Sequence, residues 1–346
     1  MNHGKMHHAS ATRSADALAD VLLDREANLD SVGPSVQAHK PLAGVGVFRD
    51  GTSGTDRKPW AIDVFIAGER ESRAFTRAIP NEFEGMRVRV SDLGGPIRYA
   101  FGPSRGRMYN PLRPGCSISR GDGHAGTLGC FVGDGADLYL VTAGHVLCGV
   151  HSPSNVDQSF RDQPIYQAAT LYGGVESRVV ARIADYRLPT VNDGYGAIVR
   201  SQLDVGIAKV VPSPEARWDL NSLGGIGCQK GGVSDPRFVG RSRVSKFGQH
   251  SGFTEGLVRN PTSSFRIELP NAGFTWMAAQ IGLFRRSKYC QAGRFAHEGD
   301  SGSIVWDRSR RPIGMIIGCA PAGVIATPWS YIQDAFQMGM LSQRRT

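Results

Sequence analysis

The stretch Glu298-Gly299-Asp300-Ser301-Gly302-Ser303-Ile304-Val305 places a serine between two glycines, just before an apolar run that predicts a β-strand. This is the layout of a loop that presents a nucleophile. A serine hydroxyl is a weak nucleophile at neutral pH, so such a loop needs a general base and an acid that orients the base. The sequence must therefore supply a histidine and a carboxylate elsewhere.

A histidine and an aspartate stand at suitable positions upstream. His145 follows an apolar run, and Asp204 precedes another one. Asp185 and Asp193 lie in the same interval and are alternative acids, although aspartates at strand edges often only cap turns. The order along the chain and the strand that follows favour Asp204. The order His, Asp, Ser is one of the known triad orders, with His145 as base, Asp204 as orienting acid and Ser301 as nucleophile.

Three segments in this order resemble the chymotrypsin-like (trypsin-like) serine proteases: Thr-Ala-Gly-His at 142–145, Asp-Val-Gly-Ile-Ala at 204–208 and Gly-Asp-Ser-Gly-Ser at 299–303. The stretches 114–117 and 126–132 resemble the beginning of the first barrel in a bacterial and plant subgroup, the narrow-leaf-type proteases, which carry an extra N-terminal domain. The resemblance implies a mainly β fold, a chymotrypsin-like double β-barrel preceded by a small α/β domain.

We accordingly expect an N-terminal α/β domain over residues 1–108 and a trypsin-like protease domain over 109–346. Apolar residues at helical spacing after a serine predict an amphipathic helix over 14–30. Near the C-terminus, Thr327 is expected to cap a helix that begins at Pro328. Short apolar or alternating runs predict strands at 44–48, 61–67, 86–90, 138–143, 179–185, 204–211, 244–247, 265–269, 278–284, 303–306 and 313–318.

The resemblance also implies the remaining parts of the site. The amides of Gly299 and Ser301 would form the oxyanion hole. Phe295 would lie at the base of the primary specificity pocket and favour an apolar or small side chain, although it could equally be an ordinary core residue. His297 and Glu298 would lie near the mouth of that pocket.

Asp300 fills the position of an aspartate that, in relatives activated by cleavage, pairs with a newly freed amino terminus. No Ile-Val-Gly-Gly-like segment precedes the barrel, so cleavage is not supported as the activating step. The pocket is expected to be preformed or to be set by another partner.

The composition restricts the classes of partner that this protein is expected to bind. A hydrophobic content of 40% with 21% charged residues is ordinary for a soluble globular protein. The net charge of +9 could suggest a nucleic-acid surface, but the basic residues are scattered and no nucleic-acid motif accompanies them. We find no apolar run that could cross a bilayer and no secretion signal. We therefore expect a cytoplasmic protein with a protein or peptide substrate, no nucleic acid and no membrane partner. A homo-oligomer or a regulatory partner bound through the N-terminal domain stays open.

Cofactor and metal chemistry are not expected. Acyl-enzyme hydrolysis needs no cofactor, and the early histidines His3, His7 and His8 are more typical of a solvated tail than of a metal site. The glycine-rich segment 224–232 lacks the ending of a phosphate loop and is interpreted as a linker between barrels. No zinc spacing occurs, and buried, reduced thiols are favoured for the six cysteines, at 116, 130, 148, 228, 290 and 319.

The sequence thus predicts a serine endopeptidase that forms an acyl-enzyme on Ser301. Two other interpretations remain. One is a catalytically silent or effector-gated binding or scaffold protein, because a fold does not fix a function. The other is an esterase with the same triad.

Overall fold

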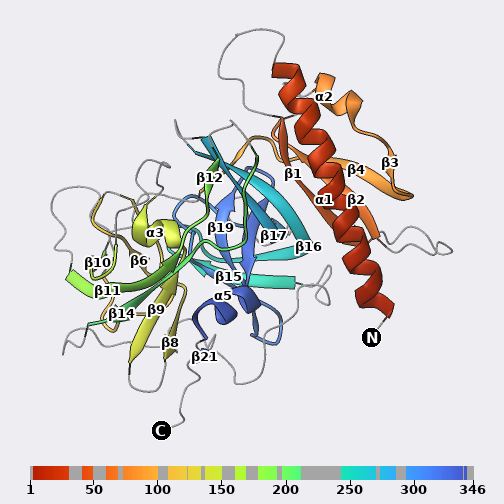
Figure 1. The fold of residues 1–346 in the computed structure, drawn as a ribbon. Helices are drawn as coiled ribbons and strands as arrows, with labels where there is room; N and C mark the ends of the chain where they lie inside the picture. The colour runs from red at the N-terminus through yellow and green to blue at the C-terminus, as the bar shows by residue number, and fades with distance from the viewer. Residues whose placement is uncertain are drawn as a thin grey trace.

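The fold is described from a computed structural model, shown in Figure 1. The residues that the structure describes are 3–30, 41–49, 60–68, 73–99, 108–122, 124–133, 137–149, 160–168, 178–192, 197–211, 243–269, 273–285, 294–337 and 339–340.

Six antiparallel strands close into a complete ring in the C-terminal half. Each strand of the series β15, β16, β17, β20, β19 and β18 pairs with the next, and β18 pairs back to β15. Apolar side chains fill the interior of this second barrel. Its strands are β15 (Arg243–Gly248), β16 (Gly252–Leu269), β17 (Gly273–Arg285), β18 (Ile304–Trp306), β19 (Pro312–Cys319) and β20 (Val324–Pro328).

A first barrel precedes it in the chain. The strands β10, β11, β14, β9 and β8 form one antiparallel ladder, and β21 (Gly339–Met340) adds to β8. The circle closes through β6, which pairs with β7. Ser119, the residue after β6, bridges Tyr166 of β10, and β7 leads directly into β8. The strands are β6 (Ser117–Ile118), β7 (Gly126–Thr127), β8 (Cys130–Gly133), β9 (Leu138–Thr142), β10 (Pro164–Gln167), β11 (Arg178–Arg187) and β14 (Val205–Val210), and the short helix α3 (Gly144–Cys148) follows β9.

The N-terminal elements extend the sheet of the second barrel. The far half of the long strand β16 pairs with β1, and β1 pairs with β2, so one sheet continues from the barrel into the N-terminal region. Helix α1 lies along this extension in Figure 1 and buries Leu18 and Leu22 against it. These elements are α1 (His3–Asp30), β1 (Leu42–Arg49), β2 (Trp60–Ile66), α2 (Arg73–Ala78), β3 (Glu82–Phe83), β4 (Met86–Asp92) and β5 (Ile97–Tyr99). Two short strands, β12 (Val191–Asn192) and β13 (Arg200–Ser201), pair with β17.

The predicted fold class is confirmed: the chain is mainly β, with two barrels and a small helix-containing N-terminal region, the chymotrypsin-like arrangement. Every predicted strand overlaps an observed one. The predicted boundary at residue 108 stays a prediction, and the β1–β16 pairing makes the sheet continuous across it. The glycine-rich segment 224–232 lies outside the described residues.

Both predicted helices begin elsewhere than expected. Helix α1 begins at His3 instead of residue 14, and His8, expected in a solvated tail, is buried with its ring 4.6 Å from that of Trp60. Thr327 does not cap the last helix, because it belongs to β20 and its buried hydroxyl donates to Gln280 Oε1 at 2.9 Å. Helix α5 (Trp329–Phe336) follows Pro328 without a side-chain cap.

The cysteines agree with the expectation of reduced, buried thiols where they can be seen. Cys116, Cys130, Cys148 and Cys319 are free and buried. Cys228 and Cys290 lie outside the described residues.

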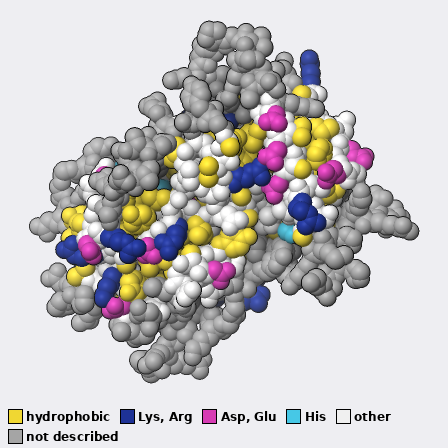
Figure 2. Space-filling model, in the orientation of Figure 1, with side chains coloured by type: hydrophobic (Ala, Val, Ile, Leu, Met, Phe, Trp, Pro, Cys, Tyr) yellow, Lys and Arg dark blue, Asp and Glu magenta, His cyan; other side chains and the backbone are white. Residues whose placement is uncertain are grey.

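The charged surface is mixed in sign. Figure 2 shows Lys and Arg side chains (dark blue) interspersed with Asp and Glu (magenta) on the face it presents. Surface ion pairs such as Lys209 with Asp137, at 2.6 Å, fit this pattern. The absence of a nucleic-acid partner stays a prediction. None of the helices described here has the length and apolar character needed to cross a membrane.

Candidate active site

His145 and Asp204 form a buried pair. Strand β9 ends at Thr142 and α3 begins at Gly144, which places His145 in the first turn of that helix. The Nδ1 atom of His145 lies 2.5 Å from Asp204 Oδ2, and its backbone N–H donates to Oδ1 at 2.9 Å. A Cβ at Gly144 would lie 2.8 Å from Asp204 Oδ1, so only glycine permits this approach. Both carboxylate oxygens therefore hold one histidine.

Asp185, another candidate acid, does not occupy this position. Asp185 pairs with Arg161 and with Arg187, both at 2.9 Å, and all three side chains are partly exposed. Asp193 lies outside the described residues. Among the described candidates, the structure thus brings Asp204 to the histidine.

Thr127 ties the loop of Ser301 to the first barrel. Its N–H donates to the Ser301 carbonyl oxygen at 2.7 Å, and its hydroxyl donates to the Gly299 carbonyl oxygen at 2.8 Å. The Ser301 hydroxyl donates to the Ile317 carbonyl oxygen at 3.1 Å. A hydroxyl carries a single hydrogen, so attack on a substrate requires this hydrogen to turn from Ile317 toward a base.

Gly302 lets the same loop reach the end of β9. Its φ is +94°, and a Cβ there would lie 2.2 Å from both the Thr127 carbonyl oxygen and Thr142 Oγ1. Thr142 ends β9, which leads directly to His145. The Ser301 loop of the second barrel therefore packs against the end of the strand that leads to His145.

Gly299 and Ser301, the predicted oxyanion donors, follow a turn that glycine makes possible. Gly299 has φ +100°, a conformation that residues with a Cβ rarely adopt. A Cβ there would also lie 2.2 Å from Gln249 Nε2. The turn is closed by the Asp300 N–H, which donates to the His297 carbonyl oxygen at 3.0 Å. The role of the two amides stays a prediction.

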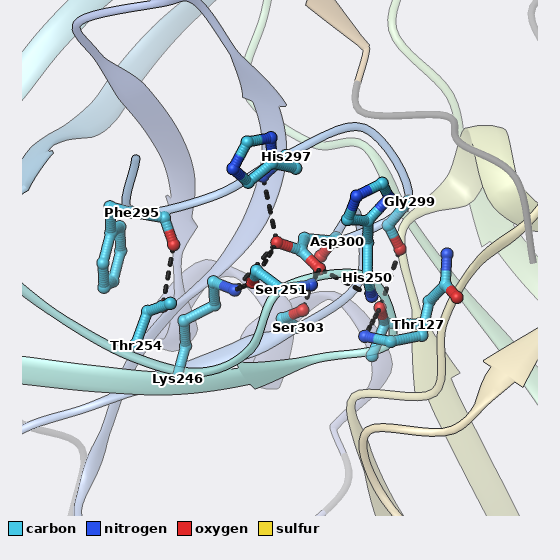
Figure 3. A network of polar contacts seen from close by, with 11 residues as sticks. Thr127, Lys246, His250, Ser251, Thr254, Phe295, His297, Gly299, Asp300 and Ser303 are labelled. Atoms are coloured by element: carbon cyan, nitrogen blue, oxygen red, sulfur yellow. Dashed lines mark hydrogen bonds and ion pairs between the residues drawn. The ribbon is translucent and has the colours of Figure 1, made fainter. Parts of the chain in front are cut away.

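Asp300 lies at the centre of a buried polar network (Figure 3). Lys246 Nζ is 2.8 Å from its Oδ2, and both side chains are 0% exposed. The Ser251 hydroxyl donates to the carboxylate at 2.6 Å, and the amides of His250, Ser251 and His297 donate at 3.0 to 3.1 Å. Burial alone would raise the pKa of Asp300, but the Lys246 ammonium and these hydrogen bonds outweigh it and hold that pKa below its ordinary value.

Lys246 supplies the partner of Asp300 that the sequence left open. It comes from β15, 54 residues before the aspartate, and its charge lies against the residue that precedes Ser301. Alternate residues of β15 are buried, and Lys246 takes one of these inward positions. A lysine at the inward position of an alternating strand is the signal that could have revealed this pair.

The residues predicted to bind substrate differ in their surroundings. Phe295 is buried among the apolar side chains of the second barrel, as an ordinary core residue would be. The His297 ring stacks on that of His250, with centroids 5.3 Å apart, and burial and then His250 lower its pKa. Glu298 is exposed. A substrate-binding role stays a prediction for Phe295, His297 and Glu298.

Tyr99, to which the sequence assigned no role, packs on His145. Their ring centroids are 4.3 Å apart, and the Tyr99 hydroxyl shares a hydrogen bond of 3.1 Å with Thr275 Oγ1. Burial, and then the negative charge of Asp204, raise the pKa of Tyr99 well above its ordinary value, which keeps the phenol neutral. A side chain of the N-terminal region thus lies over the imidazole.

No group of three or more His, Cys, Asp or Glu side chains that could hold a metal ion occurs among the described residues.

No model of a known protein family and no curated protein matches the chain. Several solved structures are similar to it. A glutamic-acid-specific serine protease, described as using a novel histidine triad in substrate binding, is 19% identical; the match covers 66% of this chain and 100% of that one, with a TM-score of 0.43. Protease A of Thermobifida fusca is 14% identical over 67% of this chain and 100% of its own, with a TM-score of 0.42.

A protease from M. tuberculosis, in its active form, is 14% identical to this chain. That match covers 66% of this chain and 82% of the other, with a TM-score of 0.36. With identities and TM-scores this low, these similarities carry no argument about the chemistry of this chain.

Proposed function

We propose that this protein is a serine endopeptidase in which Ser301 is the nucleophile, His145 the general base and Asp204 the acid that orients the base. The buried His145–Asp204 pair carries the proposal. A carboxylate that accepts from Nδ1–H leaves Nε2 as the basic nitrogen, and it stabilises the imidazolium that forms when Nε2 takes a proton.

The proposed reaction has two halves. Ser301 Oγ attacks the carbonyl carbon of a peptide bond while its proton passes to His145 Nε2, which gives a tetrahedral intermediate. The intermediate collapses, the carbon–nitrogen bond breaks, and His145 gives its proton to the departing amine. Water then attacks the acyl-enzyme with His145 again as base, which releases the acid and restores Ser301.

The loop around Ser301 supports this chemistry. The amides of Gly299 and Ser301 would donate to the oxyanion of each intermediate, and one such donor is worth about 3 to 4 kcal/mol of transition-state stabilisation. The Lys246–Asp300 pair would hold the loop in that shape, because Asp300 stands between the two donors in sequence.

Covalent labelling tests the proposal. A fluorophosphonate, used in excess until labelling is complete, is expected to modify Ser301 of the full-length protein and to leave Ser301→Ala unmodified. Ser309→Ala, which alters an exposed serine eight residues on, is the matched control and should label fully. His145→Ala should label far more slowly, by about a thousandfold or more, because the nucleophile has lost its base.

A substrate comparison separates the protease from the other interpretations. Cleavage of a peptide library by the native protein, absent in Ser301→Ala, is expected. Turnover of simple esters without any peptide cleavage would favour the esterase, and a Ser301 that resists every probe would favour the scaffold.

A further inference from the structure

Strand β5 (Ile97–Tyr99) is held between two strands of the second barrel. It pairs antiparallel with the end of β19, with Tyr99 opposite Gly318 and Arg98 opposite Cys319. On its other side it pairs in parallel with β16. The N-terminal region thus places a three-residue strand on the edge of β19.

This edge of β19 runs past the nucleophile loop. The Gly302 N–H donates to the Ile316 carbonyl oxygen at 2.8 Å, and the Ser301 hydroxyl donates to that of Ile317 at 3.1 Å. Gly318 comes next in the strand and faces β5. An extended peptide gains main-chain hydrogen bonds by adding to a sheet edge, so a peptide whose carbonyl must reach Ser301 would pair along this edge.

The segment that leads into β5 is hydrogen-bonded to the N-terminal sheet at Leu93, shortly before β5 pairs with β19. The Leu93 N–H donates to the Ile66 carbonyl oxygen of β2 at 3.0 Å. The Leu93 carbonyl oxygen in turn accepts from the Ala322 N–H, beyond β19, at 3.0 Å. The segment therefore connects the N-terminal sheet to the turn between β19 and β20 before it enters the site.

We propose that β5 is an autoinhibitory strand. It occupies the edge of β19 that a peptide substrate would use, and its Tyr99 ring covers His145 at 4.3 Å between centroids. Peptide hydrolysis then requires β5 to leave this edge, and the rate is set by the fraction of molecules in which it has left. The inference rests on the proposed function, since an autoinhibitory strand presupposes an active site.

Rates of labelling in the full-length chain test the proposal. Tyr99→Ala removes the ring from His145, and Tyr99→Phe is its comparison because it keeps the ring and loses only the hydrogen bond to Thr275. Arg98→Pro removes a strand N–H and misfits the strand backbone, and Arg98→Ala is its control because the Arg98 side chain is exposed. Two probes are used: a small fluorophosphonate and a peptidyl phosphonate long enough to pair along β19.

We expect Tyr99→Ala and Arg98→Pro to label about tenfold faster than the native protein, because each loses a contact that favours the closed state. Arg98→Ala should label at the native rate, and Tyr99→Phe should label more slowly than Tyr99→Ala because its ring still covers His145. The peptidyl probe should gain more than the small probe from Arg98→Pro, because only the peptidyl probe needs the vacated edge.

A second measurement is independent of catalysis. Amide hydrogen exchange in residues 312–319 should be faster in Arg98→Pro than in Arg98→Ala, because β5 protects the edge of β19. Thermal melting verifies that each variant is folded. If Tyr99→Ala fails to fold, the comparison of Arg98→Pro with Arg98→Ala tests the proposal.

The outcomes separate the two proposals. Equal labelling rates in the native protein and all four variants would overturn the autoinhibitory strand and leave the protease intact. Equal hydrogen exchange of residues 312–319 in Arg98→Pro and Arg98→Ala would also overturn the autoinhibitory strand, whether or not a probe modifies Ser301. Faster exchange in Arg98→Pro with a Ser301 that no probe modifies would show that β5 leaves the edge but guards no hydrolase, and the proposed function would fail.

Discussion

Replacement of Lys246 by methionine should show how strongly one buried charge stabilises the loop that carries Ser301. Methionine keeps most of the volume of the side chain and removes its ammonium group. The Asp300 carboxylate, whose side chain is 0% exposed, would then remain buried without the ammonium group of Lys246. Removing one partner of a buried ion pair costs about 3 to 5 kcal/mol, because the remaining charge is left without compensation. We expect a loss of that size in the free energy of unfolding at pH 7.

The pH dependence of this loss follows from the pKa of Asp300. In the native protein that pKa is held below its ordinary value, so the ion pair stabilises the fold above the ordinary value and loses this effect as the pH falls through the lowered pKa. In Lys246→Met the pKa-raising effect of burial remains and is opposed only by the hydrogen bonds from Ser251 and the backbone amides, so the pKa of Asp300 should rise. The difference between the two proteins should therefore be largest near neutral pH and shrink below about pH 4.

Urea denaturation across this pH range measures the effect. Lys209→Met is the matched control, because the Lys209–Asp137 pair has a similar distance, 2.6 Å, but side chains that are 50% and 36% exposed. It should cost less than about 1 kcal/mol. Adding Asp300→Asn to Lys246→Met should recover part of the loss, since the amide removes the unpaired charge. A loss in Lys246→Met no greater than in Lys209→Met, or one that does not change with pH, would refute the reasoning.

Three further predictions concern the triad, the loop and the thiols. Asp204→Asn, made in whichever of the native, Tyr99→Ala and Arg98→Pro proteins reacts readily with the fluorophosphonate, should lower the turnover of a peptide substrate by about 10⁴-fold, because the amide favours the wrong tautomer of His145. Retention of the parent protein's turnover would exclude Asp204 as the acid. Gly302→Ala should melt at a clearly lower temperature than Gly252→Ala. Both glycines have positive φ, but only at Gly302 would the added Cβ lie 2.2 Å from a backbone atom, the Thr127 carbonyl oxygen. Equal melting temperatures would contradict the close packing around Gly302. Cys319, whose pKa burial raises to about 12, should resist alkylation at pH 8 in the native state and react on unfolding, and mass mapping that finds it modified in the native protein would contradict its burial.

Local patterns located most of the longer strands, because each of these signals is carried by neighbouring residues, and they also named the candidate triad. Alternation of apolar and polar side chains reports which face of a strand is buried, and glycine on both sides of Ser301 reports a tight loop. The same local rules gave the wrong start for α1, because polar residues before residue 14 weaken the amphipathic pattern, whereas packing of His8 against Trp60 extends the helix. They also misplaced Thr327, whose hydroxyl is used by Gln280 in the barrel.

By itself, the sequence determined that the chain is mainly β, where many of its strands lie, and which histidine, aspartate and serine are candidates for one site. Only the tertiary structure decided that Asp204 holds His145, that Lys246 is the partner of Asp300, and that Tyr99 covers the imidazole. The physical reason is the range of the interactions. A strand pattern depends on adjacent side chains. An ion pair between β15 and the Ser301 loop, or a strand from the N-terminal region on the edge of β19, arises only when distant segments pack together and exclude water between them.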